Sequence, residues 1–171
     1  MSTQMEIMYA PLSAGGVRAL LHHATVLRQW AATLLEHERD QIQGDYLVDC
    51  KMCAMGALII TAFEPDELER ERDRARDRLL RHWGEDTSDA DLGTLIGDQL
   101  YHEAKEKLEV TQTAFADVAQ QVRTTRPGIS GWSIFQQNDV DKIPFNVFAT
   151  AAVEVAVAYE EAAGAYPGPH V

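Results

Sequence analysis

Two cysteines, Cys50 and Cys53, stand at the C-x-x-C spacing that serves both metal ligation and thiol redox chemistry. A structural zinc site needs two further Cys or His ligands, and the sequence holds no second C-x-x-C and no H-x-x-x-H. His82 and His102 would complete a tetrahedron only through the tertiary fold. A thioredoxin-like motif needs a β-α-β context, which the surrounding pattern lacks. We interpret the pair as thiols packed like small apolar side chains, with no cofactor expected and a structural zinc protein as an alternative.

Cys53 is also a candidate nucleophile. The pattern places it in the first turn of an apolar helix, where the helix dipole lowers the pKa of a thiol. A downstream histidine, His82 or His102, and then Asn138 give the Cys…His…Asn order of papain-like enzymes. Those enzymes take their histidine from a β-subdomain, and no persuasive strand is present here. A hydrolase or transferase that uses Cys53 therefore stands as an alternative to a chain without catalytic function.

A segment with two large aromatic residues precedes the last predicted helix. Residues 129–142 read ISGWSIFQQNDVDK, with Trp132 and Phe135 ahead of Asp139. If the two rings are exposed they are interface anchors, and if they are buried they close one end of a helical bundle. We favour burial of the rings, and we keep Trp132, Phe135 and Asp139 as candidate binding residues.

The net charge narrows the classes of partner. The 171 residues include 15 Lys and Arg against 27 Asp and Glu, which gives a formal net charge of −12. Such an excess repels nucleic-acid phosphates and anionic membranes, and it attracts basic protein surfaces. We expect a protein partner with a basic surface, and no direct nucleic-acid or membrane binding. The sequence holds no P-loop, G-x-G-x-x-G or G-x-S-x-G motif.

Helices must position these residues, because apolar residues recur at helical spacing through most of the chain. The predicted fold is an all-α, single-domain bundle of five to six helices with a buried C-terminal helix. An N-terminal arm (1–12) precedes the helical domain (13–164), in which Ser13 is a plausible first N-cap, and a flexible tail (165–171) follows. The pattern predicts helices over 13–42, 52–63, 64–83, from 88 to a break near 111–113, from there to a stop at 126–128, and over 144–163. The helix over 64–83 keeps few apolar residues and is expected to be solvated, and Ser88 with Asp91 resembles a capping box. Residues 129–142 are expected to form a loop.

The most apolar stretch is Phe145–Tyr159 in the last predicted helix. It is too short to span a bilayer and carries Glu154. Homo-oligomerisation stays open, because such a helix serves a dimer seam as well as a monomer core. The first residues lack the basic and apolar regions of a signal peptide, so we expect a cytoplasmic location.

Two short motifs, Cys53-Ala54-Met55-Gly56-Ala57-Leu58 and Asn138-Asp139 ahead of an Ala/Val-rich final helix, stand in the chain. Together they resemble a small uncharacterised domain family of actinobacteria and their phages. The chain departs from that family at Gln137, where Trp is usual, and at Ile143-Pro144, which replace a basic residue and Thr. The resemblance covers about half the chain and implies a phage or prophage accessory protein, without an activity or functional residues to transfer.

Together these observations favour a non-enzymatic, acidic helical protein. The hypothesis is that it is phage-encoded and acts in the host cytoplasm by binding a host or viral protein. In one version of this hypothesis, binding inhibits a host factor.

Overall fold

The fold is built almost entirely from α-helices, as predicted. The computed structural model describes residues 14–83 and 88–165, and within these ranges it contains seven α-helices, one short 3₁₀ helix and a two-stranded hairpin. Ser13, the arm at 1–12 and all but the first residue of the tail at 165–171 lie outside the described residues. The α-helices are α1 (Ala14–Glu36), α2 (Ala57–Ala62), α3 (Pro65–Trp83), α4 (Asp89–Leu108), α5 (Gln112–Thr125), α6 (Ile134–Asp139) and α7 (Phe145–Gly164).

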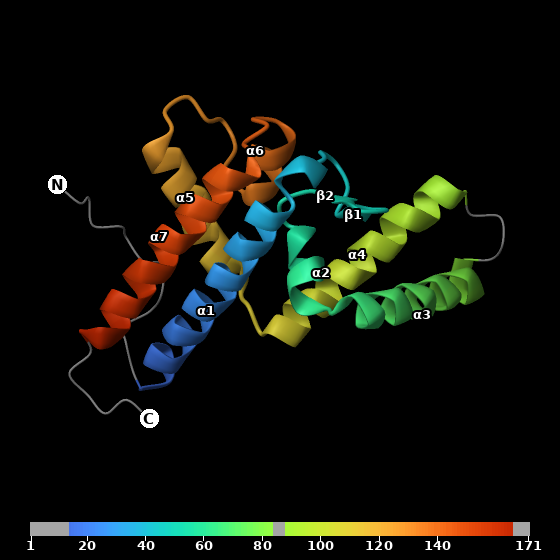
Figure 1. Ribbon diagram of the computed structural model, residues 1–171, viewed down its shortest axis with the longest axis horizontal. Helices are drawn as coiled ribbons and strands as arrows, with labels where there is room; N and C mark the ends of the chain where they lie inside the picture. Colours follow the sequence, from blue (N-terminus) through green and yellow to red (C-terminus); the bar gives the residue numbers. More distant parts are fainter. Residues whose placement is uncertain (1–13, 84–87, 166–171) are drawn as a thin grey trace.

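The body of the molecule consists of α1, α5 and α7, with α7 packed along α1 and against α5 (Figure 1). The burial of the C-terminal helix is confirmed, and its buried positions include several alanines, which allow neighbouring helices to approach closely. Most of this helix is covered within one chain, by α1 and α5. The buried apolar face of α1 follows the predicted spacing: Val17, Leu20, Ala24, Leu27, Ala31 and Leu34.

Trp30 of α1 lies at the centre of this body and is fully buried. Its ring meets the edge of Phe115 in α5 at 5.3 Å and lies 6.4 Å from the ring of Phe148 in α7, between ring centroids. Its indole N–H donates to the backbone oxygen of Ala54 at 2.9 Å. One side chain therefore joins the three body helices to the segment that carries Cys53.

The segment predicted as one helix over 52–63 is helical only over its second half. Residues before it form a small antiparallel hairpin, β1 (Leu47–Val48) and β2 (Lys51–Met52), with Leu47 paired to Met52. The prediction was wrong here because the backbone of this segment has partners outside a helix. The N–H of Ile42 donates to the oxygen of Met52 at 2.8 Å, and the N–H of Cys53 donates to the oxygen of Asp45 at 3.2 Å. The segment is apolar because it is buried, and burial does not require a helix.

The first helix and the aromatic segment also differ from expectation. α1 ends at Glu36, and a 3₁₀ turn (Glu38–Asp40) precedes an extended Gln41, so the chain leaves helical geometry before Ile42. The segment predicted as a loop over 129–142 contains α6, which raises the described helices to seven. Ser133 begins it, because its hydroxyl accepts a hydrogen bond from the N–H of Gln136 at 3.2 Å.

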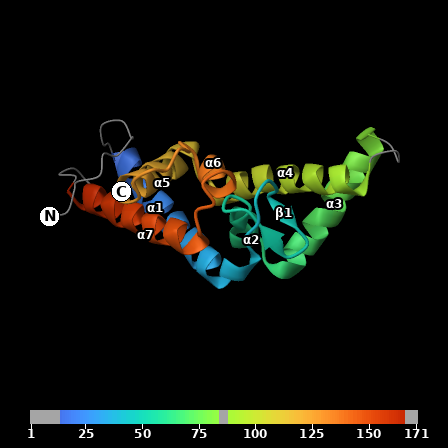
Figure 2. The ribbon, with the colours of Figure 1, turned by 90° about the horizontal axis from the view of Figure 1, so that it is seen from above.

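A helical hairpin, α3 and α4, projects from the body (Figures 1 and 2). α3 is solvated as predicted, with Ala75 its only fully buried residue. Ser88 caps α4 by accepting from the N–H of Asp91, as its capping-box pattern indicates. The described helices include none that is both long enough and apolar enough to cross a membrane.

Candidate functional site

The turn between α5 and α6 is held by hydrogen bonds to one carboxylate, that of Asp141. Asp141 accepts hydrogen bonds from the N–H and the hydroxyl of Ser130 at 3.1 and 2.9 Å, and from the N–H of Gly131 at 2.8 Å. These bonds, that of the Ser130 backbone first, lower the pKa of Asp141. A β-carbon at Gly131 would lie 2.8 Å from both the Asp141 carboxylate and the Gln137 nitrogen, so this close approach requires glycine.

This rigid turn presents Trp132 to solvent. The side chain is 70% exposed, so the expectation that it is buried was wrong. The guanidinium of Arg123 lies 3.6 Å from the centre of the indole ring. Arg123 is itself fixed, because it donates to the backbone oxygens of Ile129 and Gly131 at 3.0 and 3.1 Å. The backbone N–H of Trp132 donates to the side-chain oxygen of Gln136 at 2.9 Å, which fixes the backbone from which the exposed indole extends.

Phe135, one turn further, faces the interior. It is half-buried, and its ring meets Tyr46 and Tyr101 edge-on at 5.4 and 5.9 Å between centroids. Tyr46 and Tyr101 are stacked at 4.4 Å. The two aromatic residues predicted to act together are therefore divided, with Phe135 packing against the core and Trp132 forming the surface. Arg123 and Asp141, which support Trp132, were not singled out from the sequence.

Asn138 and Asp139 tie α6 to distant backbone. The buried Asn138 oxygen accepts from the side chain of Gln41 at 2.9 Å and from the N–H of Ala54 at 3.0 Å. Its amide group donates to the oxygen of Ile42 at 2.9 Å and to Asp139 at 2.8 Å. Asp139 also accepts from the N–H of Gly44 at 3.0 Å. The bonds of Asn138 are structural, so Asn138 does not orient a histidine. One oxygen of the half-buried Asp139 is engaged in the same way, by Gly44 and Asn138.

Cys53 lies before α2 rather than in its first turn, so the predicted lowering of its pKa by the helix dipole is wrong. The side chain is buried, and this burial is the largest cause that raises the pKa of the thiol to about 11. Its sulfur accepts from the N–H of Gly56 at 3.3 Å. A buried sulfur with a raised pKa is the opposite of an activated nucleophile.

His82 and His102 are brought near each other rather than near Cys53. Both are exposed, one at the end of α3 and one on α4, and both line a groove of about 830 Å³ between these helices. Cys53 is not among the lining residues of that groove. The order Cys…His…Asn in the sequence therefore does not become a catalytic arrangement in space.

The two cysteines of the C-x-x-C motif have different environments. Cys50 is exposed in the turn of the β-hairpin, and Cys53 is buried. Over residues 14–83 and 88–165 no three His, Cys, Asp or Glu side chains gather in a group that could hold a metal ion. The zinc hypothesis is thus left without a ligand set in the described part of the chain.

The exposure of the two thiols predicts unequal alkylation. With excess iodoacetamide at pH 8, Cys50 is expected to react about 100-fold or more faster than Cys53, because the thiolate of Cys53 is scarce and its sulfur is covered. Peptide mass spectrometry of timed samples measures both rates. In denaturant the two rates should converge, and equal rates in the folded protein would restore Cys53 as a nucleophile.

Comparison of the chain with models of protein families, with curated proteins and with solved structures gave no match.

Proposed function

We propose that this protein acts by binding another protein, without catalysis of its own, and that Trp132 is the anchor of the contact. The observation that carries the proposal is a 70% exposed indole held by Arg123 and by a bonded turn. Trp and Arg are the residue types most enriched among side chains that dominate binding energy. A side chain that already packs against a fixed neighbour loses less conformational entropy when a partner covers it, so more of the free energy of its burial contributes to binding.

The net charge supports a partner with a basic surface. At −12 the chain attracts such a surface over several ångströms and speeds encounter at low salt. The resemblance of the Cys53–Leu58 and Asn138-Asp139 motifs to an actinobacterial and phage family supports the further proposal of a phage accessory protein. That protein would act on a host factor in the host cytoplasm.

The test is capture of a partner from an actinobacterial lysate on the immobilised protein, followed by titration of the purified partner. Trp132→Ala is expected to raise the dissociation constant about 30-fold or more, the effect of losing one dominant aromatic contact. Raising the salt concentration should also weaken binding, because it screens the attraction between acidic and basic surfaces.

A matched control is available in another exposed apolar side chain. Leu35 is 53% exposed on α1, and Leu35→Ala should leave capture unchanged. If Leu35→Ala and Trp132→Ala lose the captured protein equally, the contact is non-specific adhesion to exposed apolar side chains. If wild type and Trp132→Ala capture the same proteins with the same affinity, the assignment of Trp132 is wrong.

A further inference from the structure

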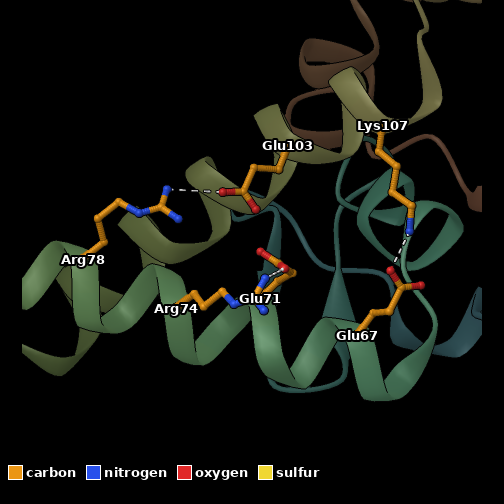
Figure 3. A network of polar contacts seen from close by, with 6 residues as sticks. All are labelled: Glu67, Glu71, Arg74, Arg78, Glu103 and Lys107. Atoms are coloured by element: carbon orange, nitrogen blue, oxygen red, sulfur yellow. Dashed lines mark hydrogen bonds and ion pairs between the residues drawn. The ribbon is translucent and has the colours of Figure 1, made fainter.

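The α3–α4 hairpin is a two-helix unit with one side open. α3 packs mainly against α4, and near its start against α2, while the rest of the hairpin extends away from the body (Figures 1 and 2). Ion pairs hold the two helices together: Lys107 to Glu67 at 2.8 Å and Arg78 to Glu103 at 3.4 Å (Figure 3). These pairs are largely exposed, so each contributes little to holding the two helices together. The hairpin therefore has little holding it beyond its narrow apolar seam.

The groove of about 830 Å³ on this hairpin has an apolar floor. Leu79 and Leu95 are half-buried in it, and Trp83 at its end is 61% exposed. The side-chain oxygen of Gln99, which also lines the groove, is buried and has no hydrogen-bond partner in the described part of the chain. Apolar surface open to water is a feature that a covering partner would remedy.

The two walls of the groove carry opposite charge. α3 contributes Arg78 and Arg81, and α4 contributes Asp98, Glu103 and Glu106. Burial is the largest cause that raises the pKa of both Asp98 and Glu103, so these carboxylates are already partly removed from water. An occupant that fits both walls presents acidic groups to α3 and basic groups to α4, beside an apolar strip.

A second copy of the same hairpin meets that requirement. α3 holds six arginines and six acidic residues and is formally neutral, whereas the chain as a whole carries −12. α4 holds five acidic residues and two lysines, a formal charge of −3, so two copies attract at this hairpin only where walls of opposite charge face each other. A two-fold axis that places α3 of one copy against α4 of the other sets each cationic wall against an anionic wall.

We propose that this protein forms a homodimer in which the α3–α4 hairpins of two copies pack groove to groove as a four-helix bundle. The helices of 19 and 20 residues are about 28 and about 30 Å long, and two side by side are about 20 Å wide. A face of that size is of the order of the ~800 Å² that each partner contributes to a standard interface. Trp83 and the leucines of the floor form the centre of the contact.

Charge reversal tests the pairing of walls without assuming a register. One variant carries Arg78→Glu and Arg81→Glu, so that both its walls are acidic, and a second carries Glu103→Lys and Glu106→Lys, so that its α4 wall becomes basic. Sedimentation equilibrium is expected to give wild type a mass of twice the 19.0 kDa of one chain. Each variant alone should dimerise at least 10-fold more weakly, and an equal mixture of the two should recover the dimer mass.

Arg18→Glu, an exposed position on α1, is the control and should keep the wild-type mass. Circular dichroism checks that every variant keeps its helices. A wild-type protein that stays monomeric at about 100 μM overturns the proposal, as does a dimer that survives in both wall variants. Trp132→Ala should leave the dimer intact, so failure of the partner contact at Trp132 and failure of the dimer are told apart.

Discussion

Gly56→Ala is expected to destabilise the fold by about 4 kcal/mol or more, a large part of the roughly 5–15 kcal/mol that stabilises a typical domain. A β-carbon at this position would lie 1.6 Å from the backbone oxygen of Tyr46 and 2.5 Å from its carbonyl carbon. Neither atom belongs to a flexible side chain, so the contact can be relieved only by moving the backbone. The N–H of Gly56 also donates to the sulfur of Cys53, so such a movement breaks a second contact.

Gly93→Ala is the matched control for this prediction. Gly93 lies in α4, and nothing lies within 4 Å of the position that its β-carbon would take. Alanine there should stabilise the protein by up to about 1 kcal/mol, because glycine is a poor helix former. Urea denaturation of both variants, followed by circular dichroism, measures the two effects. A Gly56→Ala protein as stable as wild type would show that the approach of Tyr46 to α2 is not as close as described.

Asn138→Ala is expected to cost about 3–5 kcal/mol. The change removes four hydrogen bonds and leaves the N–H of Ala54 and the oxygen of Ile42 without their partner inside the protein. Each buried donor or acceptor that is left without a hydrogen-bond partner lowers the free energy of unfolding by about 1–3 kcal/mol. Because Asn138 binds both Gln41 and Ala54, its loss should separate α6 from the segment that runs from α1 to α2.

Two further variants make this test specific. Asn138→Asp keeps the shape and the acceptor oxygen but loses the donors to Ile42 and Asp139, and it sets a second carboxylate beside Asp139, so it should also be strongly destabilised. Asn146→Ala, at an exposed site on α7, should change the unfolding free energy by less than about 0.5 kcal/mol. Urea denaturation measures all three. Equal stability of the Asn138 and Asn146 variants would contradict the structural role of Asn138.

Gly56 and Asn138 give a physical account of the two short motifs in the sequence. In Cys53–Leu58, the glycine permits the approach of Tyr46 and the cysteine sulfur accepts from that glycine. In Asn138-Asp139, both side chains bind backbone far away in the chain. The N–H of Ala54 and the oxygen of Asn138 join the two motifs directly, 84 residues apart. Their residue types are therefore explained by folding alone.

The helical class, the buried last helix and the solvated α3 followed from the sequence, because helical spacing of apolar residues and capping patterns are local properties. The start of α2 did not follow, because an apolar run shows that a segment is buried and not which backbone groups it binds. Neither did the short α6, whose six residues are too few for a periodic pattern to register.

The candidate site likewise followed in part from the sequence and in part only from the tertiary structure. The sequence by itself placed two aromatic residues in one short segment and two histidines after a cysteine. Only the tertiary structure decided that Trp132 faces solvent on Arg123 while Phe135 packs inward, and that the histidines line a groove without Cys53. The physical reason is that exposure and the pKa of a thiol depend on which distant segments cover a side chain, and contacts between distant segments leave no periodic trace in the sequence.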